Sequence, residues 1–391
     1  MNDDQASSVP SLWSSALLVA GMSIGGGMLA LPIRMAKLGV LLSLFAFLLM
    51  AIAMFCTGYW MGHLALSHLK KGHIIDLSEH FFGKKGKWFA FFSYFVLFYS
   101  YLIAYLSALK HLLRALLPQQ IPHVPLLSLF SLLLLFLLYR SSALYHWINR
   151  LLMWALFVSY LALITGIVQI KAEYLNRSSL TSLPAVLPLT CSAFGYQFVI
   201  PSLVAHPSSS GRSLLKILSL GLLIPLVIYS IWLVTVLGNV SLELLEKNPH
   251  ATAITPLAEA VGQPFLAQVS LYFSLFALLT SFLGVNSGLL HFLNRNRGEN
   301  ERRNSYLRLF FSMLPALYIS LHYEHLFLPA IQFGAGASCS LIFGLIPTWI
   351  AYRVQRERRF SLAWHHHLLY GGLLCLFSLT LLVAIGDFLH L

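Results

Sequence analysis

The 391 residues of this chain are too apolar for a water-soluble protein: 58% are hydrophobic, 10% are charged and the mean hydropathy is +0.77, whereas soluble domains contain about 25% charged residues. The four cysteines are scattered through apolar runs, which excludes a secreted disulfide framework. The net charge of +12 does not predict nucleic-acid binding, because the basic residues form neither a face nor a tail. We therefore expect an all-α membrane protein with no room for a separate catalytic domain.

Hydropathy predicts about eleven transmembrane helices in one domain of residues 1–391, because a helix needs roughly 20 apolar residues to cross a bilayer. The apolar runs cover residues 11–32, 38–64, 88–116, 125–139, 147–170, 185–205, 214–237, 264–292, 306–321, 327–352 and 366–389. The run at 125–139 is short, and prolines interrupt an amphipathic stretch at 250–263, so ten or twelve spans are alternatives. The acidic start of the chain lacks the basic region of a signal peptide, so we expect the first run to be retained as a span.

The distribution of basic residues predicts the orientation of the chain. If the N-terminus is cytoplasmic, 18 of the 25 lysines and arginines fall in cytoplasmic connections and 7 fall on the other side. Cytoplasmic loops carry such an excess of basic residues in membrane proteins. We therefore expect a cytoplasmic N-terminus. The lipid bilayer is the expected environment, and no obligate protein partner is predicted.

The first predicted helix contains a break near its middle. Gly25, Gly26 and Gly27 are consecutive in this helix, and three glycines in place of alanine cost a helix roughly 2–3 kcal/mol. Unwound backbone is tolerated at membrane depth only where it lines a cavity or meets a ligand. The break therefore predicts a binding site. Close helix packing through Gly21 and Gly25 is the alternative interpretation.

The sixth predicted helix has a matching interruption, with Gly195 near its centre and Pro201 two turns later. Two interrupted helices five spans apart are typical of secondary transporters built from inverted repeats. We expect repeat one at about 11–170, repeat two at about 185–352 and an extra helix at about 366–389. A channel would need polar residues along several helices, which these spans lack. The spans also contain neither a nucleophile and base pair nor a nucleotide loop, so we do not expect an enzyme.

The ends of broken helices suit a zwitterionic substrate. Helix N-termini offer free N–H groups to a carboxylate, and unwound carbonyl groups accept hydrogen bonds from an ammonium group or bind a cation. An amino acid satisfies both ends without a charged side chain at the membrane centre, where the sequence has almost none. The expected substrate contacts are Ser23, Ile24, Gly25, Gly26, Gly27 and Met28 at the first break, and Phe194, Gly195, Tyr196 and Gln197 at the second.

Aromatic residues near the breaks predict a flat substrate. Tyr101 and Tyr105 lie one turn apart on the third predicted helix, so both can face the same side. With Phe194 and Tyr196 they can form a wall that stacks on an aromatic ring. Ordinary packing in a bundle with 28 phenylalanines is the alternative for each of them. No metal site or cofactor is expected, because the histidine-rich segments lie in connections that lack the fixed geometry of metal ligands.

Three segments carry motifs of a known transporter family. They are Ser23-Ile24-Gly25-Gly26-Gly27-Met28-Leu29-Ala30-Leu31-Pro32, Ser192-Ala193-Phe194-Gly195-Tyr196 and Leu279-Thr280-Ser281-Phe282-Leu283-Gly284-Val285. Through them the chain resembles, over nearly its whole length, the bacterial hydroxy and aromatic amino acid permeases of the amino acid-polyamine-organocation superfamily. The resemblance implies a leucine-transporter-like fold and an inner-membrane symporter that imports tyrosine or a related aromatic amino acid by alternating access. Where the family often has Phe-Gly-Phe-His, this chain has Phe194-Gly195-Tyr196-Gln197, which leaves the choice among aromatic substrates open.

The resemblance also implies a place for a coupling ion. In sodium-driven members of the superfamily, carbonyl groups of the first break and a Thr-Ser pair on the eighth span hold the cation. The residues similar to that arrangement are Gly21, Ile24, Thr280 and Ser281. Oxygen ligands suit a hard cation, whereas serine and threonine hydroxyls in helices often bond their own backbone. We expect proton coupling, as the resemblance implies, and keep a sodium-coupled transporter of aromatic or other neutral amino acids as the alternative.

Overall fold

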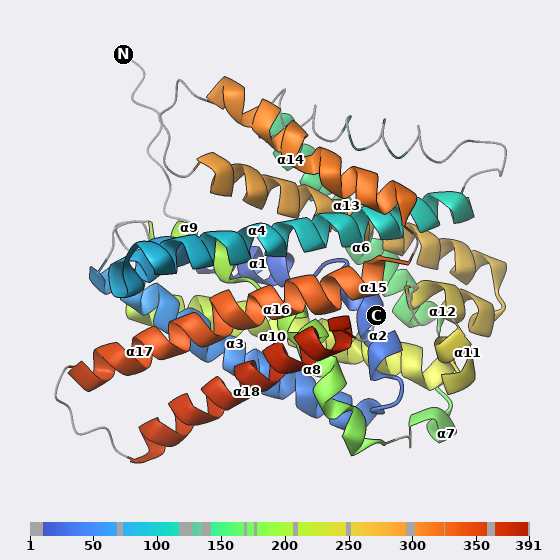
Figure 1. The fold of residues 1–391 in the computed structure, drawn as a ribbon. Coiled ribbons are helices and arrows are strands. Elements are labelled where there is room, and N and C mark those ends of the chain that lie inside the picture. The colour runs from blue at the N-terminus through green and yellow to red at the C-terminus, as the bar shows by residue number, and fades with distance from the viewer. Residues whose placement is uncertain are drawn as a thin grey trace.

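The fold, given by a computed structural model, is described for residues 11–68, 73–116, 127, 129, 131, 133, 142–167, 170–175, 178–205, 210–247, 252–294, 302–323, 325–357 and 364–389. Within these ranges all regular secondary structure is helical. The long helices pack side by side in one bundle (Figure 1). The predicted all-α class is therefore confirmed.

The first half of the chain begins with a bent pair of helices. It contains α1 (Leu12–Ser23), α2 (Gly27–Met35), α3 (Val40–His68), α4 (Ile74–Leu116) and α6 (Ser142–Gly166). The predicted span at 125–139 lies outside the described residues except at positions 127, 129, 131 and 133. Helix α4 begins at residue 74 because a separate helical segment, with Ile74, Ile75 and Leu77 buried, precedes the predicted span, which follows a kink at Gly83. Gly83, with φ 67°, turns the backbone inside it.

The second half contains a second broken span. It consists of α8 (Leu183–Ala193), the 3₁₀ turn η2 (Gln197–Val199) and α9 (Ile200–Val204). The long helices are α10 (Gly211–Asn239), α13 (Pro264–Asn294), α14 (Arg302–His322) and α18 (Trp364–Leu389). One further span runs through α15 (Phe327–Pro329), η4 (Ala330–Ala335), α16 (Gly336–Cys339), η5 (Ser340–Leu345) and α17 (Ile346–Glu357). Short elements in the connections are α7 (Ala172–Leu175), η1 (Leu180–Ser182), α11 (Leu242–Lys247) and α12 (Ile254–Val261).

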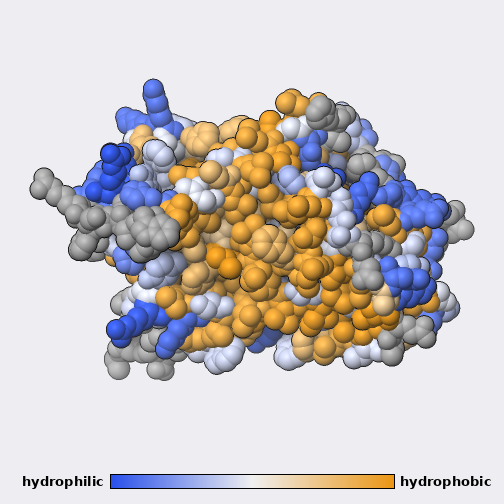
Figure 2. Space-filling view, turned by 90° about the horizontal axis from the view of Figure 1, so that it is seen from below, coloured by the Kyte–Doolittle hydropathy of each residue, from blue (hydrophilic) through white to orange (hydrophobic). Residues whose placement is uncertain are grey.

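The described helices account for most of the predicted spans. Eight of them are long and apolar enough to cross a membrane, and the bent pair α1 and α2 adds a ninth. Helix α14 contains a shorter apolar stretch, Met313–His322. Helix α12 has only 8 residues, so the amphipathic stretch around it does not form an additional span. Figure 2 shows an apolar belt across the middle of the bundle and hydrophilic residues at both ends, as expected for a surface that faces lipid.

The span at residues 327–357 is helical throughout but contains two π-helical stretches, η4 and η5, which hydropathy does not predict. Its glycines lie directly against neighbouring helices. A Cβ at Gly334 would lie 1.9 Å from Ser100 Oγ of α4, and a Cβ at Gly336 would lie 2.7 Å from the Pro188 carbonyl oxygen of α8. Stretches of π-helix are frequent at functional sites, and this one packs against the first part of the second broken span.

Both predicted interruptions are breaks in the structure. Helices α1 and α2 meet at an angle of 55°, with residues 24–26 between them. Helix α8 ends at Ala193, and helical structure resumes at Gln197. In both places the last carbonyl groups of a half-helix lie inside the bundle. Since the membrane interior supplies no hydrogen-bond donors, the protein has to supply them.

One hydroxyl group on α10 serves both breaks. Tyr229 Oη donates to the carbonyl oxygen of Ser23, the last residue of α1, and lies 3.1 Å from the carbonyl oxygen of Ala193, the last residue of α8. One turn further along α10, Trp232 Nε1 donates to the carbonyl oxygen of Met28 on α2 at 3.0 Å. Helix α10 thus holds both halves of the first broken span and joins the first break to the second.

We predict that Tyr229→Phe lowers the thermal stability of the protein, because at least one of the two carbonyl groups then lacks its donor. An unsatisfied buried acceptor costs about 1–3 kcal/mol. Thermal unfolding of the purified protein in detergent measures the loss. Tyr272→Phe is the matched control, since the Tyr272 side chain is 46% exposed on the surface of α13. Equal unfolding temperatures for the two variants would show that Tyr229 does not hold the breaks.

Candidate functional site

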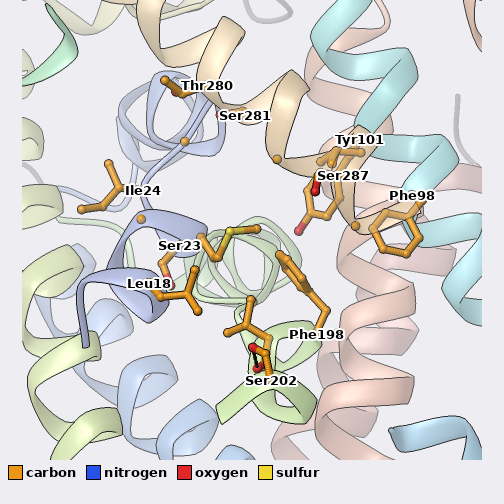
Figure 3. Close-up of a pocket in the computed structure, with 18 of the residues that line it drawn as sticks. Leu18, Ser23, Ile24, Phe98, Tyr101, Phe198, Ser202, Thr280, Ser281 and Ser287 are labelled. Carbon is orange, nitrogen blue, oxygen red and sulfur yellow. Dashed lines mark hydrogen bonds between the residues drawn. The ribbon is translucent and has the colours of Figure 1, made fainter. Parts of the chain in front are cut away.

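A cavity of about 710 Å³ lies between the two breaks. Its walls come from the two broken spans, α4, α6 and α13, and Figure 3 shows part of this lining. The volume falls in the range of small-molecule sites. The cavity extends to the end of the bundle where α1 begins, since Leu18 of α1, Asp76 of α4 and Ala205 after α9 line it there. We call this end the mouth.

Most of the predicted site residues line the cavity. They are Gly21, Ser23, Ile24, Gly25, Gly27, Tyr101, Tyr105, Gly195, Thr280 and Ser281. The rings of Tyr101 and Tyr105 are stacked, with centroids 5.8 Å apart. Tyr101 Oη donates to the carbonyl oxygen of Ser192 at 3.0 Å. The tyrosine pair therefore forms one wall of the cavity and also satisfies a carbonyl group at the end of α8.

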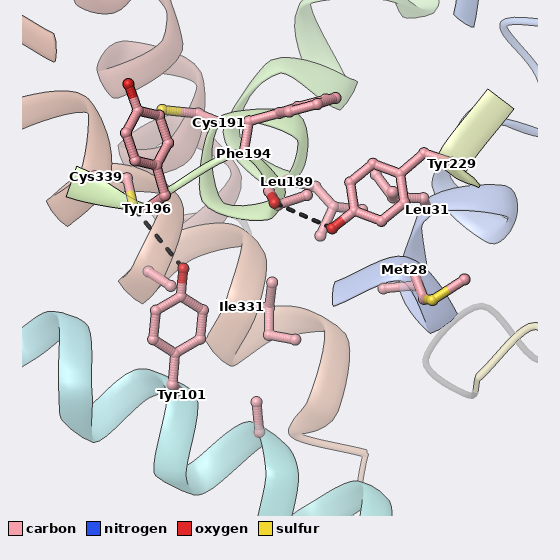
Figure 4. Packing of buried hydrophobic residues seen from close by; sticks show 14 of the residues in the cluster. Met28, Leu31, Tyr101, Leu189, Cys191, Phe194, Tyr196, Tyr229, Ile331 and Cys339 are labelled. Carbon is pink, nitrogen blue, oxygen red and sulfur yellow. Dashed lines mark hydrogen bonds between the residues drawn. The ribbon is translucent and has the colours of Figure 1, made fainter. Parts of the chain in front are cut away.

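Phe194 does not line the cavity, although the sequence predicts that it contacts the substrate. Its side chain is 0% exposed, and its ring packs against Phe47 with a centroid distance of 6.0 Å and against Tyr229 with a centroid distance of 5.3 Å. Figure 4 shows Phe194 and Tyr229 in this cluster of buried residues. The backbone explains the difference. Helix α8 ends one residue earlier, so helical spacing no longer determines the direction of this side chain. In the structure Phe194 packs between α3 and α10.

Tyr196 and Gln197 also point away from the cavity, toward α3. Tyr196 Oη donates to the carbonyl oxygen of Met54 at 3.2 Å. Gln197 Nε2 lies 3.4 Å from both the Met54 carbonyl oxygen and Thr57 Oγ1, and its Oε1 accepts from the Tyr196 N–H at 3.1 Å. Buried polar groups require such partners. Gly58 makes the approach possible, because a Cβ there would lie 1.9 Å from Tyr196 Oη.

Gly26 and Met28 lie behind the first break rather than in the cavity wall. The Gly26 N–H donates to Ser281 Oγ at 2.7 Å, and a Cβ at Gly26 would lie 2.6 Å from the Tyr105 ring. The Met28 side chain is buried, and its carbonyl group accepts from Trp232. Both residues thus hold the break against α4, α10 and α13.

Opposite helix ends meet at the first break. The C-terminal end of α1 carries a partial negative charge, and the N-terminal end of α2 carries a partial positive charge. Ser23, Gly25 and Gly27, which flank these ends, line the cavity. This arrangement can bind an ammonium group beside α1 and a carboxylate at the N–H groups of α2.

The predicted ion-site hydroxyls lie together and already make hydrogen bonds. Thr280 Oγ1 donates to the Phe276 carbonyl oxygen at 2.9 Å, and Ser281 Oγ donates to the Ala277 carbonyl oxygen at 2.6 Å. Ser281 Oγ also accepts from the Gly26 N–H. The Tyr105 hydroxyl is a further side-chain hydrogen-bond partner of Ser281, so this hydroxyl is already engaged by three groups of the protein. Among the described residues, no cluster of three His, Cys, Asp or Glu side chains could hold a metal ion.

The cavity contains further residues that the sequence patterns do not single out. They are His73, Asp76, Phe98, Asn149, Phe198 and Ser287. Phe98 precedes Tyr101 by three positions, and Ser287 follows Thr280 by seven, so helical spacing places both on the face of a predicted site residue. That signal could have found these two residues. Phe198 follows the second break, where no helical spacing applies.

A polar cluster closes the end of the bundle opposite the mouth. Arg34, at the end of α2, forms an ion pair of 2.8 Å with Asp387 of α18. Arg34 Nε also donates to the Ala185 carbonyl oxygen of α8 at 3.3 Å, and Gln332 of η4 donates to the same Asp387 carboxylate at 2.8 Å. The cluster therefore ties half-helices from both broken spans to α18 and η4.

A helical bundle with two broken helices around a central cavity defines a membrane transporter. The chain belongs to the tryptophan/tyrosine permease family, whose model matches residues 8–388. Among its relatives, tyrosine-specific transport system 2 of Haemophilus influenzae is 26% identical, with 88% of each chain covered. The tryptophan-specific transport protein of Shigella flexneri is 24% identical, covering 89% of this chain and 88% of the relative. Glutamine transporter 2 of Aliivibrio fischeri is 25% identical, covering 95% and 98%.

A solved structure shares the fold. The manganese transporter of Eremococcus coleocola, in complex with an aromatic bis-isothiourea compound, matches with a TM-score of 0.68 and 12% identity, covering 99% of this chain and 88% of that one. At this identity the likeness shows the fold alone, and it confirms the expected transporter fold. Because the family and the relatives are transport proteins, the expectation that the chain is not an enzyme is also confirmed.

We predict that Gly25→Ala abolishes transport, whereas Gly21→Ala leaves most of it. A Cβ at Gly25 would lie 2.4 Å from Ser281 Oγ, so the Ser281 side chain would have to turn away and lose its hydrogen bond with the Gly26 N–H, or α13 would have to move from the break. At Gly21 the nearest atom is Met153 Cε at 3.7 Å, which is an ordinary contact. The measurement is uptake of labelled aromatic amino acids, normalised to the amount of each variant in the membrane. Equal losses would show that the close approach of α13 to the break is not needed.

Proposed function

We propose that this chain is a secondary active symporter that imports an aromatic amino acid, tyrosine in particular, across a bacterial inner membrane with protons. The observation that carries the proposal is the cavity, which joins two broken helices to aromatic side chains in a member of the tryptophan/tyrosine permease family. The names of two Haemophilus influenzae relatives, tyrosine-specific transport systems 1 and 2, support the choice of tyrosine.

The helix ends and the aromatic side chains of the cavity predict how the substrate is oriented. Its carboxylate binds at the N–H groups of α2, and its ammonium group binds beside the last carbonyl groups of α1. Its ring then points across the cavity toward Tyr101, Phe98 and Phe198. Stacking and edge-to-face contacts favour an aromatic ring over an aliphatic chain in such a place.

Alternating access is supported by the two different ends of the bundle. The cavity reaches the mouth. At the other end, the polar cluster of Arg34, Gln332 and Asp387, called the Arg34 cluster, joins the helices. Lys84, Arg212 and Arg353 lie on elements that start or end on the side of the mouth. We therefore assign the mouth and the N-terminus to the cytoplasm by the positive-inside rule. In this orientation the structure corresponds to an inward-open state, and outward opening requires the Arg34 cluster to separate.

Two titratable groups near the mouth support proton coupling. His73 and Asp76 line the cavity at the start of α4. His73 Nδ1 accepts from the Ile75 N–H at 3.3 Å, and its ring lies 5.0 Å from that of Tyr94. Histidine exchanges protons near neutral pH. A proton that enters with the substrate can leave to the cytoplasm at this place.

Sodium coupling is the second candidate. It is favoured by the joint position of Gly21, Thr280 and Ser281 in the cavity wall, since hydroxyl and carbonyl oxygens suit a hard cation. The family resemblance instead implies the proton motive force, and our proposal follows it.

We predict that purified protein in liposomes accumulates labelled tyrosine when an inward proton gradient is imposed without sodium. A protonophore should abolish this accumulation. Tryptophan, phenylalanine, glutamine and serine are offered in parallel, because one relative is named a glutamine transporter. Accumulation that follows an imposed sodium gradient at equal pH would replace proton coupling by sodium coupling. Uptake of glutamine but not of any aromatic amino acid would overturn the proposed substrate.

We predict that Asp387→Asn makes the end of the bundle opposite the mouth open more often. The Arg34 and Asp387 side chains are 33% and 31% exposed, so we expect a loss of about 1 kcal/mol and about fivefold faster hydrogen exchange in α2 and α8. Glu246→Gln is the matched control, because the Lys37–Glu246 pair lies at the same end but is 64% and 46% exposed. Unchanged exchange in both variants would show that the Arg34 cluster does not hold this end closed.

A further inference from the structure

We propose that Ser287 recognises a hydrogen-bonding group on the substrate's ring, the phenolic O–H of tyrosine or the indole N–H of tryptophan, and thereby selects against phenylalanine. The inference rests on the proposed function. It adds which residue of the cavity contacts the far end of the substrate's aromatic ring.

Ser287 differs from Ser270, Thr280 and Ser281 of the same helix, and, unlike the buried Ser274 hydroxyl, which also lacks a partner among the described residues, it lines the cavity. Ser270 and Thr280 donate to carbonyl groups of their own helix at 2.7 and 2.9 Å, and Ser281 does the same. Ser287 lines the cavity, and within the described part of the chain its hydroxyl has no hydrogen-bond partner. A hydroxyl that faces a cavity in this way can both donate to a ligand and accept from it.

Aromatic side chains lie opposite this part of α13. Phe98 of α4 and Phe198 of η2 line the cavity in an edge-to-face arrangement, with ring centroids 6.4 Å apart. A Cβ at Gly288 would lie 2.9 Å from the Phe98 ring. The glycine therefore allows Phe98 to pack directly on α13, beside Ser287. The result is a hydrophobic subsite with the Ser287 hydroxyl in its wall.

The subsite lies within reach of a substrate held at the breaks. Figure 3 shows Ser287 with Tyr101 and Phe98 on one side of the cavity, across from Ser23 and Ile24 of the first break. Ser281, which accepts a hydrogen bond from Gly26 of the first break, precedes Ser287 by six positions, which is about 9 Å along α13. A tyrosine molecule spans a comparable distance from its main-chain groups to its phenolic oxygen. The main-chain groups of the substrate can thus remain at the breaks while its ring reaches Ser287.

The expected selectivity follows from the balance of hydrogen bonds. Tyrosine and tryptophan replace the water on Ser287 by a hydrogen bond of their own, whereas phenylalanine removes that water and offers no partner. Sites that bond a substrate hydroxyl reject the analogue that lacks it for this reason. Since the Ser287 hydroxyl faces a cavity that is open to water, we expect it to raise the preference for tyrosine over phenylalanine only modestly, by about twofold to tenfold.

The test is the apparent Km for uptake of tyrosine, tryptophan and phenylalanine by the full-length protein and three variants. Ser287→Ala should lower the preference for tyrosine over phenylalanine by about two- to tenfold, through a higher apparent Km for tyrosine. Ser287→Thr should keep most of the preference, because it keeps a hydroxyl group. Ser270→Ala is the matched control on the same helix, and its preference should equal that of the unaltered protein. The tryptophan arm shows whether the indole N–H uses the same hydroxyl.

A second measurement needs no variant. The unaltered protein should prefer tyrosine to 4-fluorophenylalanine, which has a similar shape but cannot donate a hydrogen bond from its ring. An unchanged tyrosine preference in Ser287→Ala, or equal uptake of tyrosine and 4-fluorophenylalanine, would overturn the role of Ser287. In either case aromatic transport by the unaltered protein would still stand. Absence of aromatic uptake by the unaltered protein would instead overturn the proposed function.

Discussion

A helix that is broken inside a membrane exposes carbonyl groups that only the protein can satisfy. The Tyr229 hydroxyl lies within hydrogen-bond distance of the last carbonyl groups of both α1 and α8 and supplies one donor between them, and Tyr101 adds a donor for Ser192. Because one side chain contacts both breaks, the breaks have to be neighbours. The cavity between them and the opposed helix ends follow from that arrangement. In the proposed function, these main-chain groups bind a zwitterion without a charged residue at the centre of the site.

In the proposed binding mode, helix α13 connects this backbone site to the substrate's side chain. Its approach to the first break depends on Gly25, where any side chain would collide with Ser281. Further along the same helix, Gly288 admits the Phe98 ring and leaves the Ser287 hydroxyl facing the cavity. Candidate ion ligands, the support of the break and the ring subsite thus share one helix. A movement of α13 would change all three together, which is a physical route from ion binding to substrate binding.

Helical spacing predicted site residues well where the helix continues and poorly where it stops. Tyr101 and Tyr105 lie on an unbroken stretch of α4, and both line the cavity. Phe194, Tyr196 and Gln197 follow the end of α8, and their side chains pack toward α3 and α10 instead. Once the backbone leaves the helix, the direction of each side chain depends on its neighbours. The partners in this case, such as Met54 and Gly58, are about 140 positions away in the sequence.

The sequence by itself determined that this is a helical membrane protein, where its first and sixth spans break, and which transporter family it resembles. Those properties depend on local composition: apolar length, consecutive glycines and short motifs. Only the tertiary structure decided which side chains enter the cavity, that α10 joins the two breaks, and that Arg34 of α2 pairs with Asp387 of α18. These contacts join residues hundreds of positions apart, and their geometry arises from how whole helices pack, which no local pattern encodes.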